Sequence, residues 1–349
     1  MAAYISFQPT DFFNTVLYIG NQPSSNPVTG VGFQPDIIWV KDRDATPNHV
    51  FFDAVRGTTK SFYPNLTNAQ VTDANGLTAF GADGFTVADW SQPNTSGDDY
   101  VSWNWKMGTT SGATFGTAGI TPTSYSINTT TGQGVYKYSG GDGFGASTVA
   151  HGLGAAPDCV IIKRIEDDGH GWQITNTAVG FDVALKLEST GAESDTSAWW
   201  NDTAPTSDVV SIGGDSWNNL SGKTFMMYCF TNKKGYFKTG VYTGNGKADG
   251  TFVYTGFRPA FVMGKVQNAT DSWHMWDNKR DPSNVVERRL EANSTSVEHT
   301  SIDWIDFVSN GFKHRYGGDG NNKIGTPYLY MAFAEFRFVS SNSKPGTAR

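Results

Sequence analysis

Six histidines are the side chains of this chain best suited to act as general bases near neutral pH. They are His49, His151, His170, His274, His299 and His314. Three of them, His49, His170 and His274, stand at comparable places in three similar stretches of the sequence. A residue repeated in every copy of a unit is more often needed for packing than for one active site. We therefore interpret these histidines as structural and predict no catalytic residue.

Two Asp-x-x-Arg pairs and two acidic loops could bind ions or ligands. The pairs are Asp53 with Arg56 and Asp277 with Arg280. This spacing favours a local salt bridge across a tight turn. The acidic loops, residues 41–46 and 165–171, lack the alternating carboxylates and final Glu of an EF-hand loop. No P-loop, HExxH or GxSxG motif is present. We therefore predict neither a metal site nor a cofactor.

Tryptophan, which occurs 11 times, could indicate sugar binding through exposed indole faces. We expect Trp39, Trp103 and Trp105 to lie in core strands. Trp199 and Trp200 are adjacent in a polar stretch, so both cannot face one sheet interior and at least one should be exposed or in an interface. Trp217 and Trp273 are further candidates for a glycan-binding or interface position.

The short sequence elements expected to form the strands around these residues recur three times. A Tyr-x-Gly element precedes a Pro-x5-Lys element by 17, 19 and 17 residues, measured from tyrosine to proline. The landmarks are Tyr18, Tyr138 and Tyr242, then Pro35, Pro157 and Pro259, then Lys41, Lys163 and Lys265. An aromatic third element follows each proline after 65, 68 and 69 residues. This spacing predicts three tandem units of about 100 residues, the size of a small β domain.

Each unit consists of short runs rich in Val, Ile and aromatic residues between turn-forming clusters, which is typical of β-strands. We predict an all-β protein of three tandem antiparallel β-sandwich-like repeats. The predicted boundaries are a docking segment at 1–15, repeats at 16–107, 134–233 and 234–339, a Gly/Ser/Thr-rich linker or arm at 108–133, and a C-terminal tail at 340–349.

Composition narrows the possible functions. Glycine accounts for 40 of 349 residues, which favours turns. The net charge is −7, so the molecule as a whole repels phosphate. A nucleic-acid-binding role is therefore not expected, and no apolar run is long enough to suggest insertion into a membrane. Cys159 and Cys229 both lie in apolar runs, so we expect buried free thiols.

The N-terminal segment is rich in large apolar side chains that are unfavourable in water. They are Tyr4, Ile5, Phe7, Phe12 and Phe13. We expect this segment to dock against another subunit or a neighbouring protein, and we expect a homotrimer, since homo-oligomers with cyclic symmetry are common.

Several stretches of the sequence resemble a known protein family. The stretches FQPTDFFNTVLYIGN, VGFQPDIIWVKDRD, FFDAVRGTTK and YVSWNWK resemble a repeated domain in structural proteins of tailed bacteriophages, notably marine and cyanobacterial phages. The resemblance is strongest over residues 1–107 and 328–349 and weakest in the second unit, which lacks FDAVRG. It implies a virion component that assembles in the host cytoplasm.

The resemblance leaves several functions open. We expect a non-enzymatic structural protein of a tailed-phage virion, in a tail fibre or adhesion role, whose partners are other virion proteins, further copies of the chain and a host surface glycan. Head decoration is the alternative role. A carbohydrate-binding module and a glycan-degrading tailspike are further alternatives, since paired carboxylates at a suitable distance cannot be recognised in the sequence alone.

Overall fold

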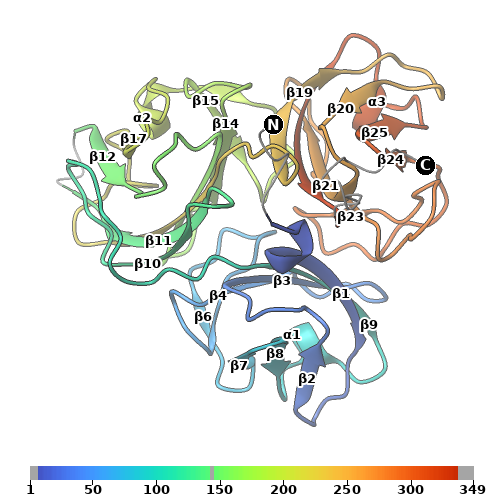
Figure 1. Cartoon of the computed structure of the whole chain (residues 1–349), viewed down its shortest axis with the longest axis horizontal. Helices are drawn as coiled ribbons and strands as arrows, with labels where there is room; N and C mark the ends of the chain where they lie inside the picture. The colour runs from blue at the N-terminus through green and yellow to red at the C-terminus, as the bar shows by residue number, and fades with distance from the viewer. Residues whose placement is uncertain (1–6, 142–144, 337–349) are drawn as a thin grey trace.

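A computed structural model describes residues 7–141 and 145–336, which form three β modules arranged as a triangle (Figure 1). We define module 1 as residues 7–107, module 2 as residues 108–231 and module 3 as residues 232–336. Every pairing between the named strands is antiparallel, which confirms the predicted all-β class. In the described residues the helices are single turns, and none could cross a lipid bilayer.

Module 1 contains one four-stranded sheet, one three-stranded sheet and one two-stranded sheet, in the orders β1-β9-β3-β4, β2-β8-β7 and β5-β6. Its elements are η1 (Pro9–Asp11), β1 (Phe13–Ile19), β2 (Asn26–Thr29), β3 (Ile37–Asp42), β4 (Val50–Asp53), β5 (Lys60–Ser61), β6 (Val71–Thr72), β7 (Leu77–Gly81), β8 (Gly84–Val87), α1 (Ser91–Asn94) and β9 (Asp99–Trp105).

Module 2 contains a seven-stranded sheet, β10-β11-β18-β13-β14-β15-β16, and the pair β12-β17. Its elements are β10 (Ser124–Asn128), β11 (Gln133–Ser139), β12 (Ser147–Ala150), β13 (Cys159–Arg164), β14 (Trp172–Asn176), β15 (Val183–Lys186), β16 (Ser194–Asp195), α2 (Ser197–Trp200), β17 (Val209–Ile212) and β18 (Thr224–Phe230). Because β10 adds a strand to this sheet, the segment 108–133 belongs to module 2 and is not a free linker.

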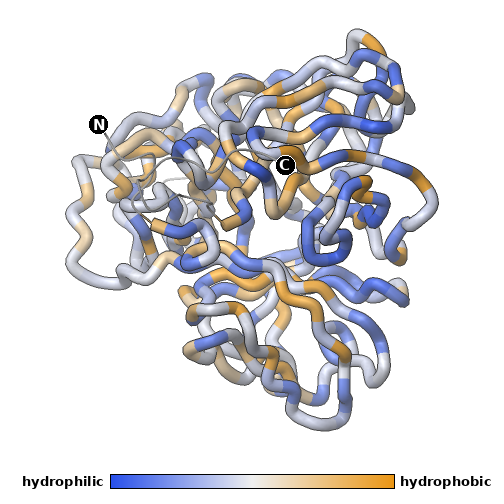
Figure 2. The backbone as a smooth tube through the Cα atoms, turned by 45° about the vertical axis from the view of Figure 1, so that its right-hand side comes forward, coloured by the Kyte–Doolittle hydropathy of each residue, from blue (hydrophilic) through white to orange (hydrophobic). Residues whose placement is uncertain are grey.

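Module 3 contains a five-stranded sheet, β19-β26-β21-β22-β23, and a three-stranded sheet, β20-β25-β24. Its elements are β19 (Phe237–Thr243), β20 (Phe252–Tyr254), β21 (Pro259–Val266), β22 (His274–Asp277), β23 (Leu290–Glu291), β24 (Ile305–Val308), β25 (Gly311–His314), α3 (Asp319–Asn322) and β26 (Pro327–Ala334). Short hydrophobic stretches alternate with hydrophilic ones along the whole chain (Figure 2).

The Pro-x5-Lys strands begin with an unbroken apolar run because both of their faces are buried. Every residue of β3, β13 and β21 is buried. In β3, Ile37 and Trp39 face a core shared by all three modules, whereas Ile38 and Val40 face the core between the two layers of module 1. A strand between two cores cannot show the polar alternation of a half-exposed strand.

The tyrosine landmarks occupy the same place in each module. Tyr18, Tyr138 and Tyr242 pair across the sheet with an aromatic residue of β9, β18 and β26 and stack on it, with ring centroids 5.0, 5.3 and 5.1 Å apart. Each hydroxyl donates a hydrogen bond of 2.7 or 2.8 Å to a backbone carbonyl. We call residues corresponding when they share such a position in the strand register.

The glycine two residues after each tyrosine is required by a close backbone approach. A β-carbon at Gly20, Gly140 or Gly244 would lie 1.9, 2.2 or 2.3 Å from a carbonyl oxygen. That oxygen belongs in each case to the loop that precedes the third element of the module. No other residue fits at this contact without moving the backbone, which explains the repeated Tyr-x-Gly sequence.

The modules contact one another in a cyclic order. Each sends a loop onto the next one, where a backbone N–H donates to a carbonyl 2.7 to 2.9 Å away. These bonds run from Gln70 to Ile165, from Glu193 to Gln267 and from Glu298 to Arg43. A second set joins a ring nitrogen to a carbonyl of the preceding module, at 3.1, 2.9 and 3.0 Å. It links Trp172 to Tyr63, Trp273 to Lys186 and His49 to Glu291.

The described part of the predicted docking segment lies inside this ring. Phe13 is 1% exposed and stacks on Phe333, with centroids 4.9 Å apart. Phe7 and Phe12 are half-buried against the same shared core, and Phe7 contacts the ring of Tyr236. The expectation that these residues dock onto another protein was therefore wrong for Phe13, because the chain's own third module covers it. Tyr4 and Ile5 lie outside the described residues.

Candidate functional site

The Asp-x-x-Arg pairs form buried salt bridges, as the spacing predicted. Asp53 and Arg56 are 2.6 Å apart, as are Asp277 and Arg280, and all four side chains are at most 1% exposed. Each aspartate also accepts a hydrogen bond from a neighbouring module, from the Tyr228 hydroxyl or from the indole of Trp103. These carboxylates are therefore fully engaged in structure, and no space is left for a ligand.

Module 2 shows that the salt bridge is not the only solution at this position. The corresponding residue is Asn176, whose side-chain oxygen accepts 2.9 Å bonds from the N–H groups of Ala178 and Val179. Its amide nitrogen donates to Thr239 of module 3 at 2.7 Å. The turn is thus held by an oxygen acceptor in all three modules, and the arginine is present only where that acceptor is charged.

Lys41, Lys163 and Lys265 are completely buried and bind backbone carbonyls. Lys163 donates to carbonyls of its own module and, at 3.4 Å, to Thr67 of module 1, while Lys265 donates at 3.2 Å to Thr190 of module 2. Lys41 donates to the carbonyls of Asp42 and Ala45. Their bonds to backbone carbonyls give these lysines a structural role. Burial lowers the pKa of all three to about 8, so their contribution to stability depends on pH.

Stability is expected to rise with pH between about 8 and 9.5. The unfolded lysines, with a pKa near 10.4, hold more protons in this range than the buried ones do, and the free energy of unfolding then increases with pH. Urea unfolding at pH 7.5, 8.5 and 9.5 measures this slope. Lys163→Met should reduce this slope, because it removes one of the three buried lysines that hold fewer protons in the folded than in the unfolded state. Cys159 and Cys229, whose pKa values burial raises, contribute with the opposite sign and leave a smaller positive slope. A wild-type slope of zero or of opposite sign would contradict the prediction.

The histidines are not in corresponding positions, which corrects the expectation from sequence. By strand register, His49 corresponds to Trp172 and Trp273, whereas His274 corresponds to Val50 and His170 lies in a loop. Burial lowers the pKa of His49 well below its ordinary value, and the ring accepts from the indole of Trp39 at 2.9 Å. A neutral, fully bonded imidazole of this kind supports the structural interpretation.

Three of the four tryptophans proposed for surface contacts are buried. Trp199 is 7% exposed, and Trp200 and Trp273 are fully buried. The single turn of α2 directs both adjacent indoles inward, which a strand could not do, so the expectation of exposure was wrong. Trp217 is half-buried, stacks on Trp199 at 5.4 Å and has the Lys186 ammonium 4.5 Å from its ring centre.

The acidic loops also have internal partners. Asp42 accepts from the N–H groups of Asp44 and Ala45, and Asp167 pairs with Arg164 and Lys223. Among residues 7–141 and 145–336, no three His, Cys, Asp or Glu side chains are placed to hold a metal ion. Both cysteines are buried, and burial raises their pKa values.

The centre of the ring is packed and holds no ligand-sized space. A cavity of about 30 Å³ lies where the three large sheets meet and is lined only by apolar and aromatic side chains. This volume holds about one water molecule, which an apolar lining does not retain. Phe333 occupies the centre, and its ring contacts Phe13, Trp105 and Phe230.

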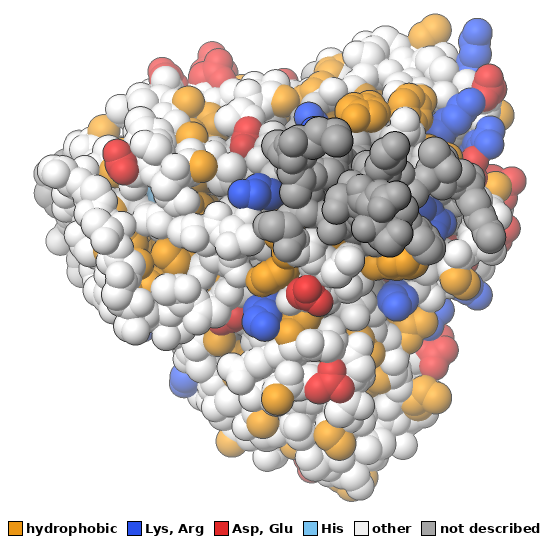
Figure 3. Space-filling view, viewed as in Figure 1, with side chains coloured by type: hydrophobic (Ala, Val, Ile, Leu, Met, Phe, Trp, Pro, Cys, Tyr) orange, Lys and Arg blue, Asp and Glu red, His pale blue; other side chains and the backbone are white. Residues whose placement is uncertain are grey.

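A groove on the outside of module 3 is the best candidate for binding. Its volume is about 290 Å³, and it lies between the turn that joins modules 2 and 3, the start of β19 and the end of β20. The residues that line it are Asn232, Lys233, Lys234, Phe237, Lys238, Tyr254, Thr255 and Gly256. On the face shown in Figure 3, most of the described surface is uncharged, and Lys and Arg side chains are most numerous at the upper right.

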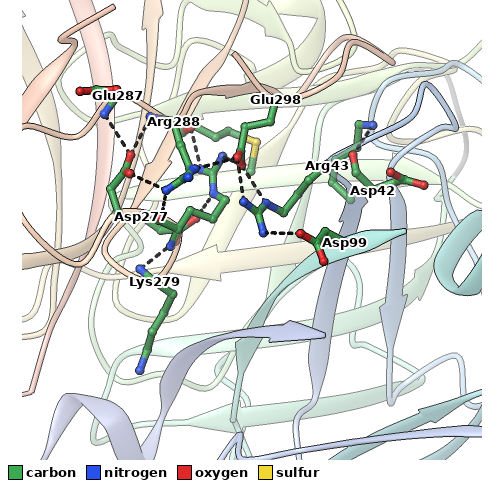
Figure 4. A network of polar contacts seen from close by, with 12 residues as sticks. Asp42, Arg43, Asp99, Asp277, Lys279, Glu287, Arg288 and Glu298 are labelled. Carbon is green, nitrogen blue, oxygen red and sulfur yellow. Dashed lines mark hydrogen bonds and ion pairs between the residues drawn. The ribbon is translucent and has the colours of Figure 1, made fainter. Parts of the chain in front are cut away.

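The contact between modules 1 and 3 closes the ring without a covalent connection. Glu298 forms two bonds with Arg43 of module 1, at 3.0 and 2.9 Å, and also binds Arg280 and Arg288 of module 3, at 3.1 and 3.2 Å (Figure 4). The side chain of Glu298 is 6% exposed. We call this contact the seam, because the other two interfaces join modules that are consecutive in sequence.

Sequence reasoning missed two groups of structural residues. Asn94, Asn219 and Asn322 are fully buried and tie the Tyr-x-Gly turn to the loop beside it. Each stands six residues before the third landmark, a repeated spacing that could have identified them. Glu298 and Arg43 carry no such signal, because 255 residues separate them and no other module has the pair.

Comparison with known families gives a match over most of the chain. The family model described as Domain of unknown function (DUF7483) matches residues 8–336. The matched range covers nearly the whole described structure, so the three modules fall within one family unit. The search of curated proteins gave no match.

Proposed function

This chain belongs to the family described as Domain of unknown function (DUF7483), and we propose that it is a non-enzymatic structural component of a tailed-phage virion with an adhesion role in the tail. The observation that supports the proposal best is the closed ring of three modules. Cyclic contacts of this kind form a rigid body with little internal freedom, which suits a particle exposed to mechanical and chemical stress.

The use of the polar side chains agrees with a structural role. Asp53, Asp277 and His49, which could have served as acids or bases, all bond to a neighbouring module. An active site needs such groups to face a cleft that admits substrate. Here they face buried interfaces and contribute to stability.

The proposed partners are other virion proteins, further copies of the chain and a host glycan. The cyclic interfaces are already occupied within one chain, so a homotrimer would have to use a different surface. The outer edges of the modules supply such surfaces. Leu17 and Ile19 of β1 are 39% and 63% exposed, and Ile324 of module 3 is 74% exposed.

Immunogold electron microscopy of purified virions tests this function. Antibodies against the folded chain should label particles at the tail, and the chain should remain with them through density-gradient purification. Label on the head would replace the adhesion role with head decoration. Absence of the chain from particles that contain the other virion proteins would overturn the proposal.

A further inference from the structure

We propose that the groove of module 3 binds an acidic saccharide, through Lys233 and Lys238 on its carboxylates and Tyr254 on a sugar ring. The inference rests on the proposed function in one respect: the adhesion role identifies the host surface as the source of the saccharide. The groove lies between the turn that joins modules 2 and 3, the start of β19 and the end of β20. A volume near 290 Å³ is at the lower end of the range of small-ligand sites and fits one or two sugar units.

The first argument is the local charge. Lys233 and Lys238 both line the groove, although the whole chain has a net charge of −7. Neither Lys233 nor Lys238 has an ion pair with any described residue. The Asp158 carboxylate is hydrogen-bonded to a residue that lines the groove: it accepts from the Asn232 N–H and also from the Thr177 hydroxyl. A local cluster of cations on an acidic molecule attracts anions to that place only.

The second argument comes from comparison among the three modules. Lys233 and Lys238 correspond to Pro9 and Asn14 in module 1, because Phe237 of β19 corresponds to Phe13 of β1. In module 2 the same positions hold Thr129 and Gly134. Modules 1 and 2 form the same fold without lysines at these positions, so the fold does not require them.

The third argument is an exposed aromatic pair on β20. Tyr254 is 62% exposed and Phe252, two residues earlier on the same strand face, is 46% exposed. The corresponding residues of module 1 are Thr29 and Pro27, which pair with Gly84 and Thr86 as Tyr254 and Phe252 pair with Gly311 and Lys313. The C–H face of a sugar ring is apolar, so stacking on Tyr254 buries apolar surface on both partners.

An acidic saccharide matches this combination better than other polyanions. The side-chain amide of Asn232 also lines the groove. Its oxygen accepts from the Thr239 N–H, and its NH2 group can donate to a sugar hydroxyl. Single-stranded nucleic acid needs a basic track several nucleotides long, which a groove of this size does not supply on an acidic protein. An anionic membrane would be recognised by a broad basic face and not by a groove.

Isothermal titration of the full chain with a galacturonic acid hexasaccharide tests the proposal. Binding is expected at low salt and should weaken as salt rises. The double variant K233Q/K238Q should lose affinity by about tenfold or more, because it removes two charge-assisted contacts. Y254A should lose about fivefold with little change in salt dependence, because it removes an apolar contact.

Matched controls separate the groove from general charge effects. K279Q removes an exposed lysine of module 3 that does not line the groove and should leave affinity unchanged. Maltohexaose, which is neutral, should not bind. Lack of binding by the acidic hexasaccharide, or equal loss in K279Q, would overturn the proposal. Equal or tighter binding of oligo(dT) or phosphatidylglycerol vesicles would also overturn it. The immunogold result on virions is independent, so failure of either proposal can be recognised separately.

Discussion

Asp53→Asn is expected to lower the free energy of unfolding by about 3 kcal/mol, because it leaves a buried guanidinium without its counter-ion. Arg56 is 1% exposed and lies 2.6 Å from the Asp53 carboxylate. Its remaining contacts are the carbonyl of Phe51 and the ring of Phe62, whose centre lies 3.7 Å from the guanidinium carbon. Urea unfolding followed by tryptophan fluorescence measures the change.

Module 2 supplies the control for this substitution. The double variant D53N/R56V carries the residues that module 2 has at the corresponding positions, Asn176 and Val179. Removing both members of a buried pair avoids the unpaired charge, so we expect the double variant to lose only about 1 kcal/mol. If the single and double variants are equally unstable, the buried charge is not the cause.

Glu298→Gln is expected to weaken the seam and to lower the free energy of unfolding by about 2 to 3 kcal/mol. The carboxylate binds Arg43 and Arg280, which are 14% and 0% exposed in their side chains, and the neutral amide cannot compensate both charges. Native-state hydrogen exchange should show faster exchange of the Glu298 N–H, which bonds to the Arg43 carbonyl. The corresponding amides of Gln70 and Glu193 should be unaffected.

Glu193→Gln is the matched control for the seam. Glu193 makes the corresponding backbone contact in module 2 and has a single 3.1 Å side-chain hydrogen bond, with Gln267. Its substitution should cost less than about 0.5 kcal/mol, because the amide oxygen of the new glutamine can still accept from Gln267. Equal losses for Glu193→Gln and Glu298→Gln would contradict the assignment of Glu298 as the residue that closes the ring.

The seam also gives a pH dependence with a defined sign. Burial alone would raise the pKa of Glu298, but hydrogen bonds and charges from Arg43 and Arg280 lower it below its ordinary value. A carboxylate whose pKa is lower in the folded state stabilises the protein fully above the unfolded value, near 4.3, and loses this effect as pH falls through the folded value. Acid should therefore destabilise the wild type more than Glu298→Gln.

The sequence by itself determined the strand content, the landmarks and the local salt bridges. The Tyr-x-Gly elements depend on contacts within one module, as the tyrosine hydroxyl bonds and the close backbone approach of Gly20 demonstrate. The pair Asp53 and Arg56 lies within one turn, so spacing alone was enough to predict it. Local constraints of this kind leave a pattern at fixed intervals along the chain.

Only the tertiary structure decided how the modules meet and which residues face outward. Trp199 and Trp200 are both buried because the single turn of α2 directs both indoles inward, and Phe13 is covered by Phe333 from the other end of the chain. The pairing of Arg43 with Glu298 joins residues 255 positions apart and depends on closure of the ring. Contacts between modules join residues that are far apart in the sequence, and no spacing within a single module encodes them.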